Sequence, residues 1–365
     1  MFIYLDESLL VEETDPIYLN VIRAIRNLAL AAFESKHILY GDFEVIEAMR
    51  AHFRYDPDVS MVFNNIYQMY SVMACPEEIT YYLKVAKESS VDSNDESGKR
   101  YGQVSYSVFE DTRSTQECNL ISEDYNDCTF YRRVLDYYKK LRRVNIPCCF
   151  NDECGSGNRT KENVRKCVYE KKQITVCVVD TDKKYPTQAI PADSTYGVCS
   201  RAGMNIPTYK FVELDVHEIE NLIPFNVTDK MTWYAENRRN KRAFDGLRNN
   251  AKSEYVLRFF DIKKGIINDE LLRTDPNYRS FAMTCYYLHP DWEANGSFET
   301  YYAGLEENAE VYPHLILNLL KKYLDYVNEN PGFEIELLEY QRDEWDKIGS
   351  AMLNMGCSRN TEAIV

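Results

Sequence analysis

The chain of 365 residues lacks several features that would define its class directly. No apolar run approaches the roughly 20 residues that a membrane-spanning helix needs. The first residues, MFIYLDESLL, carry no basic stretch of the kind that opens a secretory signal, and neither an internal repeat nor a low-complexity tract is present. We therefore expect a soluble, cytoplasmic protein without a membrane partner, built from one large domain or a few modest ones.

Zinc-binding and nucleotide-binding patterns are also missing. The chain has 11 cysteines and 5 histidines, but Cys148, Cys149 and Cys154 do not have the repeated C-x-x-C or Cys/His spacing of a zinc site. Cysteines inside apolar segments behave as small hydrophobic residues, so we expect most of them in the core. The glycine-rich segment 155–160, GSGNRT, lacks the lysine of a Walker loop, which favours a tight turn over a phosphate cradle.

Positive charge is scarce in this chain. The sequence has 43 Lys and Arg against 58 Asp and Glu, which gives a formal net charge of -15. Such a protein is repelled by phosphate backbones as a whole. If it acts on nucleic acid, the contact must come from a local basic patch, a bound divalent metal or a partner. The densest basic run is ENRRNKRAF, residues 236–244, which is either a solvated helix face or that contact.

The hydrophobic patterns divide the chain into regions of different character. Residues 15–88 show helical spacing, and the polar, acidic stretch 89–100 has the composition of a linker. Asp6 and Glu7 are expected on the surface, because the segments that follow them have helical patterns and offer no second strand. We predict a helical N-terminal region with an acidic linker at 1–100, an α/β domain at 101–225 and a helical C-terminal domain at 226–365. The predicted fold class is thus α/β, a small parallel-sheet core between mainly helical flanks.

Short strand-like and helical segments alternate within the predicted α/β domain. The strands are expected at 103–111, 146–151, 174–179 and 208–214, with amphipathic helices between them. The segment 174–179 is β-branched and apolar without alternation, which is typical of a central strand that is covered on both faces. This order predicts parallel strands joined by helical crossovers.

Carboxylates follow two of these predicted strands. Asp180 and Asp182 come directly after the segment 174–179, and Glu110 lies at the end of the segment 103–111. Ligands gather at the carboxyl ends of the strands in open α/β sheets, and carboxylate oxygens suit Mg²⁺ or Mn²⁺. A lone D-x-D also occurs where aspartate only caps a turn, so both interpretations stay open.

The order of these motifs resembles the TOPRIM domain of topoisomerases, primases and OLD-type nucleases. Glu110, the helix from Asp127, the segment IPCCFNDECGSGN and VVDTD follow one another as the elements of that domain do. The later segment HEIENLIP, which begins at His217, is similar to a segment of the TOPRIM effectors of bacterial anti-phage systems such as the PARIS system. The resemblance covers about a third of the chain and implies a TOPRIM, Rossmann-like core.

The resemblance also implies roles for individual residues. Glu110, Asp180 and Asp182 would be catalytic and would hold Mg²⁺ or Mn²⁺, and Glu218 and Glu220 would lie around the same ion or a second one. Lys183 and Lys184 are either phosphate contacts or solvated loop lysines, and His217 is either a general acid or base or a hydrogen-bonded structural residue. Which of Glu213, Glu218 and Glu220 faces the metal is left open.

The function that this resemblance implies is a metal-dependent endonuclease that cuts tRNA, other RNA or DNA. It would be the toxic effector of an anti-phage defence system, controlled by a regulatory ATPase partner, with a homodimer left open. One alternative is a non-enzymatic, acidic assembly or regulatory component of a defence complex. A nucleotidyl-transfer enzyme such as a primase is a further alternative, although no zinc-binding or nucleotide-binding module stands beside the core.

Overall fold

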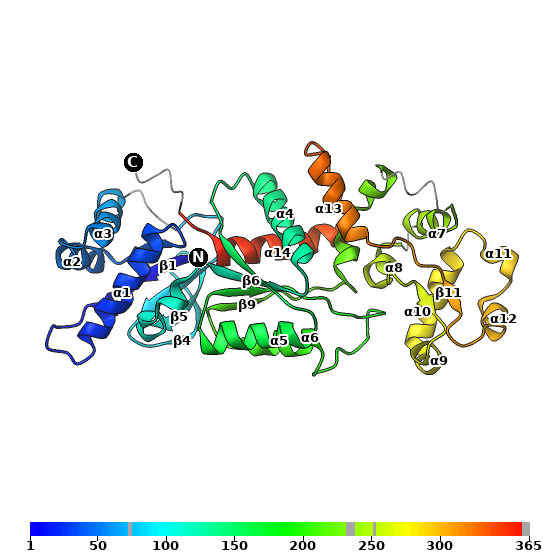
Figure 1. The fold of residues 1–365 in the computed structure, drawn as a ribbon, viewed down its shortest axis with the longest axis horizontal. Helices are drawn as coiled ribbons and strands as arrows, with labels where there is room; N and C mark the ends of the chain where they lie inside the picture. The colour runs from blue at the N-terminus through cyan, green and yellow to red at the C-terminus, as the bar shows by residue number, and fades with distance from the viewer. Residues whose placement is uncertain (72–74, 231–237, 251–252, 360–365) are drawn as a thin grey trace. The chain divides into compact units, whose positions relative to one another are not determined.

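The computed structural model describes residues 1–71, 75–230, 238–250 and 253–359, and Figure 1 shows the ribbon. Two compact units divide the chain. Unit 1 contains residues 1–179, 197–213 and those from 347 onward, and unit 2 contains residues 180–196 and 214–346. Within the described ranges, no helix has the length and apolar character to cross a membrane.

A five-stranded sheet organises the N-terminal part of unit 1. Its strand order is β2-β1-β3-β5-β4, and all neighbours are parallel except β4 and β5. The strands are β1 (Phe2–Leu5), β2 (Ile38–Gly41), β3 (Tyr81–Ala86), β4 (Ser90–Asn94) and β5 (Arg100–Ser105). The prediction of a mainly helical region at 1–100 is therefore wrong in its architecture, although its helices are real.

The predicted helices of this region accompany the sheet. They are α1 (Tyr18–Phe33), α2 (Phe43–His52) and α3 (Pro57–Met69), and a short 3-10 helix, η1 (Glu7–Leu9), follows β1. The apolar positions of α1 that sequence periodicity identified, such as Val21, Ile25 and Leu28, are buried. No strand was predicted at MFIYL, because the neighbours of β1 in the sheet, β2 and β3, lie far along the chain.

The predicted acidic linker is a hairpin of this sheet. β4 is exposed along its whole length, as an edge strand can be, so its composition shows no apolar face. The predicted boundary near residue 100 falls on the first residue of β5. The next segment does not continue as a strand, because residues 106–110 form the 3-10 helix η2 (Tyr106–Glu110), followed by η3 (Thr112–Thr115).

A second, fully parallel sheet of four strands completes unit 1. Its order is β7-β6-β8-β9, with β6 (Cys118–Ser122), β7 (Phe150–Cys154), β8 (Thr175–Cys177) and β9 (Tyr209–Phe211). The crossovers contain α4 (Tyr125–Arg142) and α5 (Asn158–Arg165), and a π-helical turn, η4 (Lys166–Glu170), extends α5. The predicted α/β class with a parallel sheet is confirmed, but its first strand is β6 and not the segment 103–111.

The layout of this sheet follows from the direction of its crossovers. The chain moves from β6 outward to β7 and then returns past β6 to β8, so right-handed connections place α4 and α5 on opposite faces. Figure 1 shows the two helices on opposite sides of β6. Every residue of β6 and of β8 is buried, as expected for central strands covered on both faces.

Unit 2 is mainly helical. The predicted C-terminal domain, 226–365, does not coincide with it, because residues 214–225 also belong to unit 2 and those from 347 onward belong to unit 1. The short helices η5 (Ile219–Leu222) and η6 (Phe225–Lys230) open it, and a two-stranded ribbon pairs β10 (Ile266–Ile267) with β11 (Glu310–Tyr312). The helices are α7 (Arg238–Arg248), α8 (Ser253–Phe259), α9 (Glu270–Thr274), α10 (Pro276–Leu288), α11 (Trp292–Asn295), α12 (Phe298–Ala303) and α13 (Leu319–Glu329). Two further helices are α6 (Thr195–Ala202) and α14 (Glu339–Gly356).

Candidate metal centre

Two segments that are distant in sequence are joined by hydrogen bonds in unit 2. The first is 180–183, which follows the buried strand segment, and the second is 216–219. The bonds run from Thr181 Oγ1 to the Val216 carbonyl (2.5 Å), from the Asp182 N–H to the His217 carbonyl (3.0 Å) and from the Ile219 N–H to Asp180 Oδ1 (2.9 Å). These bonds fix the D-x-D pair against the HEIEN segment.

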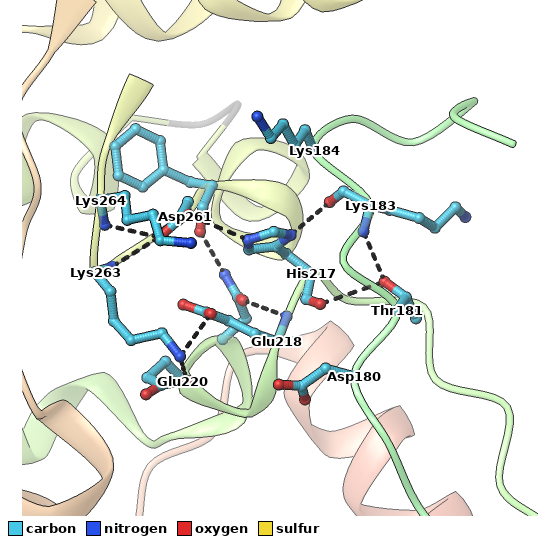
Figure 2. A network of polar contacts seen from close by, with 12 residues as sticks. Asp180, Thr181, Lys183, Lys184, His217, Glu218, Glu220, Asp261, Lys263 and Lys264 are labelled. Atoms are coloured by element: carbon cyan, nitrogen blue, oxygen red, sulfur yellow. Dashed lines mark hydrogen bonds and ion pairs between the residues drawn. The ribbon is translucent and has the colours of Figure 1, made fainter. Parts of the chain in front are cut away.

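The two aspartates of the D-x-D pair occupy different environments. Asp180 is partly buried, and Figure 2 shows it beside the turn that carries Glu218 and Glu220. Asp182 is exposed and has a left-handed backbone with φ of 56°, a conformation that aspartate adopts more readily than most residues. Only Asp180 thus lies with the buried carboxylates.

His217 is buried between a carbonyl and a carboxylate. Its Nδ1 lies 3.0 Å from the Lys183 carbonyl oxygen, and its Nε2 lies 3.5 Å from Asp261 Oδ2. Burial alone would lower the pKa of His217, but the contact with Asp261 and the nearby Glu218 raise the pKa above its ordinary value. Burial likewise acts to raise the pKa of Asp261, and the hydrogen bond from His217 outweighs it, so that pKa is lowered. The two side chains form a charged pair.

Glu218 and Glu220 are both buried and share one ammonium group. Lys263 Nζ lies 2.8 Å from Glu218 Oε2 and 3.2 Å from Glu220 Oε2, and the second contact is an ion pair without hydrogen-bond geometry. Glu218 Oε1 is buried without a hydrogen-bond partner. Burial, and next the charge of Glu220, raise the pKa of Glu218 to about 7. Two carboxylates thus share the positive charge of Lys263.

Asn221 anchors the turn that carries these carboxylates. It has no exposed surface, and its Oδ1 accepts the Glu218 N–H at 3.0 Å. Its Nδ2 donates to the carbonyls of Leu257 (2.6 Å) and Phe260 (2.9 Å). The side chains of Tyr340 and Gln341 on α14 donate to the Asn221 carbonyl. The position of Glu218 is therefore determined by α8 and α14 as well as by its own turn.

The donor set of this cluster suits a divalent cation. His217, Glu218 and Asp261 each offer one ligand atom, and these atoms lie within 4.8 Å of one another. Oxygen donors favour Mg²⁺ or Mn²⁺, and an imidazole nitrogen is more compatible with Mn²⁺. The unpartnered Glu218 Oε1 is a buried acceptor that a metal would satisfy. Binding through His217 requires the imidazole to lose its proton.

The structure brings some of the predicted site residues together in unit 2. Asp180, Glu218 and Glu220 belong to the network in Figure 2. Lys183 pairs with Asp215 (3.4 Å) and Lys184 with Asp269 (2.8 Å), so the predicted phosphate contacts are engaged with carboxylates. Glu213 is exposed, which distinguishes it from the buried Glu218 and Glu220.

Glu110 does not occupy its predicted place. It ends η2 and not a strand of the four-stranded sheet, its Oε2 lies 3.9 Å from Arg23 on α1, and its carbonyl accepts a hydrogen bond from Asn27. The prediction failed because Val104, Tyr106 and Val108 alternate like strand residues, while only the part up to Ser105 pairs with β3.

Three acidic or basic residues of interest were not identified from the sequence. Glu123 follows β6, which pairs with β8 in register Ile121↔Cys177. The sequence signal that could have identified Glu123 is an acidic residue directly after a short, uncharged segment. Asp261 and Lys263 follow α8, and no motif in FDIKK distinguishes them. Their role depends on folding alone.

The basic run that was expected to contact nucleic acid is largely neutralised by carboxylates. Residues 236 and 237 lie outside the described part of the chain, and the rest belongs to α7. The ion pairs of α7 are Arg239–Glu310 (2.7 Å), Lys241–Asp245 (2.5 Å), Arg242–Asp291 (2.7 Å) and Arg248–Asp229 (2.7 Å). Paired cations have less charge to offer to phosphates.

Comparison of the chain with protein-family models, with curated proteins and with solved structures found no match. The candidate site is therefore defined by its own residues and geometry.

Replacement of Asn221 by alanine tests the anchor of the turn. The variant leaves the Leu257 and Phe260 carbonyls and the Glu218 N–H without their partner, so we expect the free energy of unfolding to fall by about 3 kcal/mol. Urea denaturation measures the change. Asn64→Ala, at an exposed position of α3, is the control and should alter stability by no more than about 0.5 kcal/mol. Equal effects of the two substitutions would contradict the anchoring role.

The raised pKa of Glu218 predicts how stability depends on pH. In the unfolded chain this carboxyl ionises near its ordinary pKa of 4.5, and in the folded chain near 7. The stabilisation is complete below pH 4.5 and is lost as pH rises to about 7, with a change on the order of 3 kcal/mol. His217, whose pKa is also raised, acts in the same direction. Melting temperatures in EDTA across this range measure the loss.

Glu218→Gln removes the titrating group, so the loss of stability with pH should become smaller in this variant. Mn²⁺ should raise the melting temperature of the wild type at pH 8, by an amount equivalent to about 2.7 kcal/mol at one hundred times the dissociation constant. The variant should respond less. Glu213→Gln, at an exposed position, is the control for both measurements. A wild-type melting temperature that does not change with pH would contradict the shifted pKa.

Proposed function

We propose that the protein is a divalent-metal-dependent nuclease that hydrolyses phosphodiester bonds. The observation that carries this proposal is the buried carboxylate of Glu218, whose Oε1 has no hydrogen-bond partner, in a network with Asp180 and the His217–Asp261 pair. A buried, incompletely neutralised carboxylate is costly unless a cation binds it. Perturbed carboxyl groups of this kind are concentrated at functional sites.

The residues of the network have distinct tasks in this proposal. Bound Mg²⁺ or Mn²⁺ would polarise the scissile phosphate and lower the pKa of a bound water. His217, Glu218 and Asp261 would hold the ion, and Asp180, whose carboxylate the Ile219 N–H keeps in position, would add a further oxygen. Lys263 neutralises the remaining charge of Glu218 and Glu220. His217 would have to lose its proton to bind the ion, and the Lys183 carbonyl, 3.0 Å from Nδ1, would orient the imidazole.

The topology of the four-stranded sheet supports a TOPRIM-like core as part of the proposal. The order β7-β6-β8-β9 places β6 and β8 side by side, with Glu123 after the first and Asp180 soon after the second. In that arrangement Glu123 replaces Glu110 as the carboxylate that follows the first strand. We further propose, from the resemblance, that the nuclease is the effector of an anti-phage system, acts on RNA or DNA and is controlled by a regulatory ATPase.

A non-enzymatic assembly or regulatory component is the second candidate. The observation that favours it is the dense hydrogen bonding around Asn221 and His217, which would also serve a purely structural polar core. In that case the carboxylates would stabilise unit 2, and their replacement would impair folding more than any activity.

Cleavage of a mixed panel of plasmid DNA, single-stranded DNA and total tRNA tests the proposal. The purified protein should cut at least one substrate with Mg²⁺ or Mn²⁺ and none with EDTA. Asp180→Asn retains an acceptor for the Ile219 N–H while it removes the charge, so we expect a normal melting temperature and about a hundredfold loss of activity or more. Glu218→Gln should behave in the same way.

Glu213→Gln, at an exposed position, is the matched control and should cut as the wild type does. If the ATPase partner silences the protein, the assay with the separated protein remains valid, because the partner is absent. No cleavage of any substrate with either metal, or full activity of Asp180→Asn, would overturn the nuclease proposal.

A further inference from the structure

A basic groove lies between the α5 segment and α6 in unit 1. Its volume is about 450 Å³. Three of its lining residues are cations, Lys161 and Arg165 from α5 and Arg201 from α6, and Tyr169 from the π-helical turn lies with them. Val164 and Val198 provide an apolar part of the lining. With Glu162 as its one acidic lining residue, the groove combines a net positive charge, an aromatic ring and apolar side chains.

The surroundings of the groove are basic although the chain as a whole is acidic. Residues 158–172, NRTKENVRKCVYEKK, contain six Lys or Arg and two Glu in a chain with a net charge of -15. Arg159, Lys166 and Lys172 are exposed, and none of them forms an ion pair with a described residue. In α7, by comparison, four cations are paired with carboxylates.

The groove cation Arg165 has only a weak partner. Its contact with Glu170 is 3.3 Å long, and the two side chains are 71% and 52% exposed. Exposed ion pairs of this kind contribute little free energy and are weakened further by salt. A phosphate can therefore compete for Arg165 at small cost, with a bidentate geometry that favours the guanidinium group.

Tyr169 presents an aromatic ring next to these cations. Its hydroxyl donates a hydrogen bond to the Ala202 carbonyl, which ties the side chain to the end of α6, and half of the residue remains exposed. An exposed, anchored ring is a platform on which an unpaired base can stack. The bases of a duplex are stacked on each other and do not offer that contact.

We propose that this groove binds a single-stranded segment of nucleic acid. Lys161, Arg165 and Arg201 contact backbone phosphates, and Tyr169 stacks with a base. The inference rests on the proposed nuclease function and deepens it, because it assigns the substrate contact that an acidic nuclease needs. It replaces the α7 run as the nucleic-acid contact of the chain.

Fluorescence anisotropy of the full-length protein tests the groove without any cleavage. The probes are a labelled single-stranded RNA, a single-stranded DNA and a DNA duplex of the same length, measured in EDTA at several salt concentrations. The groove variant is K161Q/R165Q/R201Q. The matched control is R239Q/R242Q/R248Q, which removes the same charge from α7, and thermal melting verifies that both variants are folded.

We expect the wild type to bind the single strands more tightly than the duplex. The groove variant should lose most of this affinity, and its slope of log K against log salt should decrease by about 2, as three lost phosphate contacts predict. The control variant should bind within about twofold of the wild type, because α7 is not part of the groove and its three arginines lie 2.7 Å from their carboxylate partners. Tyr169→Leu should weaken single-strand binding about tenfold and leave duplex binding unchanged.

Equal losses in the groove variant and in the control would overturn the proposal, as would the absence of single-strand binding by the wild type. An unchanged affinity of Tyr169→Leu for single strands would overturn the stacking contact. Asp180→Asn separates this inference from the nuclease proposal, because it should bind as the wild type does. Single-strand binding without metal-dependent cleavage would refute the nuclease proposal and support the groove. Metal-dependent cleavage, together with a groove variant that binds single strands as the wild type does, would support the nuclease and refute the groove.

Discussion

The hydrogen bonds between residues 180–183 and residues 216–219 are the constraint on which the candidate site depends. They connect the segment that follows β8 in the chain to a turn more than thirty residues later. Each of them uses a backbone N–H or carbonyl, which every sequence must satisfy when it is buried. Three of them also use a side chain, that of Thr181, His217 or Asp180. The Asp180 carboxylate accepts the Ile219 N–H and so makes the site depend on an acidic side chain.

The electrostatic balance of the site follows from this arrangement. The turn 218–221 buries Glu218 and Glu220 together, and Lys263 forms an ion pair with each of them. His217 and Asp261 balance each other. Burial and the excess negative charge raise the pKa of Glu218. The same excess charge makes the site suitable for a divalent cation, because a proton and a metal ion relieve the same repulsion.

Sequence patterns predicted some elements of this architecture and missed others for identifiable physical reasons. The segment 174–179 was recognisable because its residues are mostly apolar and β-branched, and Asp180 was found with it. β6 was not recognised because it contains Asn119 and Ser122, both buried. Gln173 satisfies Asn119 at 3.0 Å, and Cys128 lies 3.0 Å from the Ser122 hydroxyl. These partners exist only in the folded protein, so the polar residues concealed a central strand and, with it, Glu123.

The same limit applies to the charges of the site and of the groove. Lys263 and Asp261 acquire their role from the turn after α8, which brings them to His217 and Glu218. The basic run of α7 was prominent in the sequence, whereas its carboxylate partners lie up to 71 residues away in the chain. Local composition therefore drew attention to α7 and not to α5, where the cations are spread over a helix and a π-helical turn.

Calorimetric titration of Mn²⁺ tests the central claim, that the buried carboxylates form a metal centre, most directly. Experiments at pH 7 in two buffers with different ionisation enthalpies give both the affinity and the number of protons released. The account predicts binding that releases protons from Glu218 and His217, with weaker binding and fewer released protons for Glu218→Gln. The absence of binding by the wild type, or identical titrations for the two proteins, would contradict it.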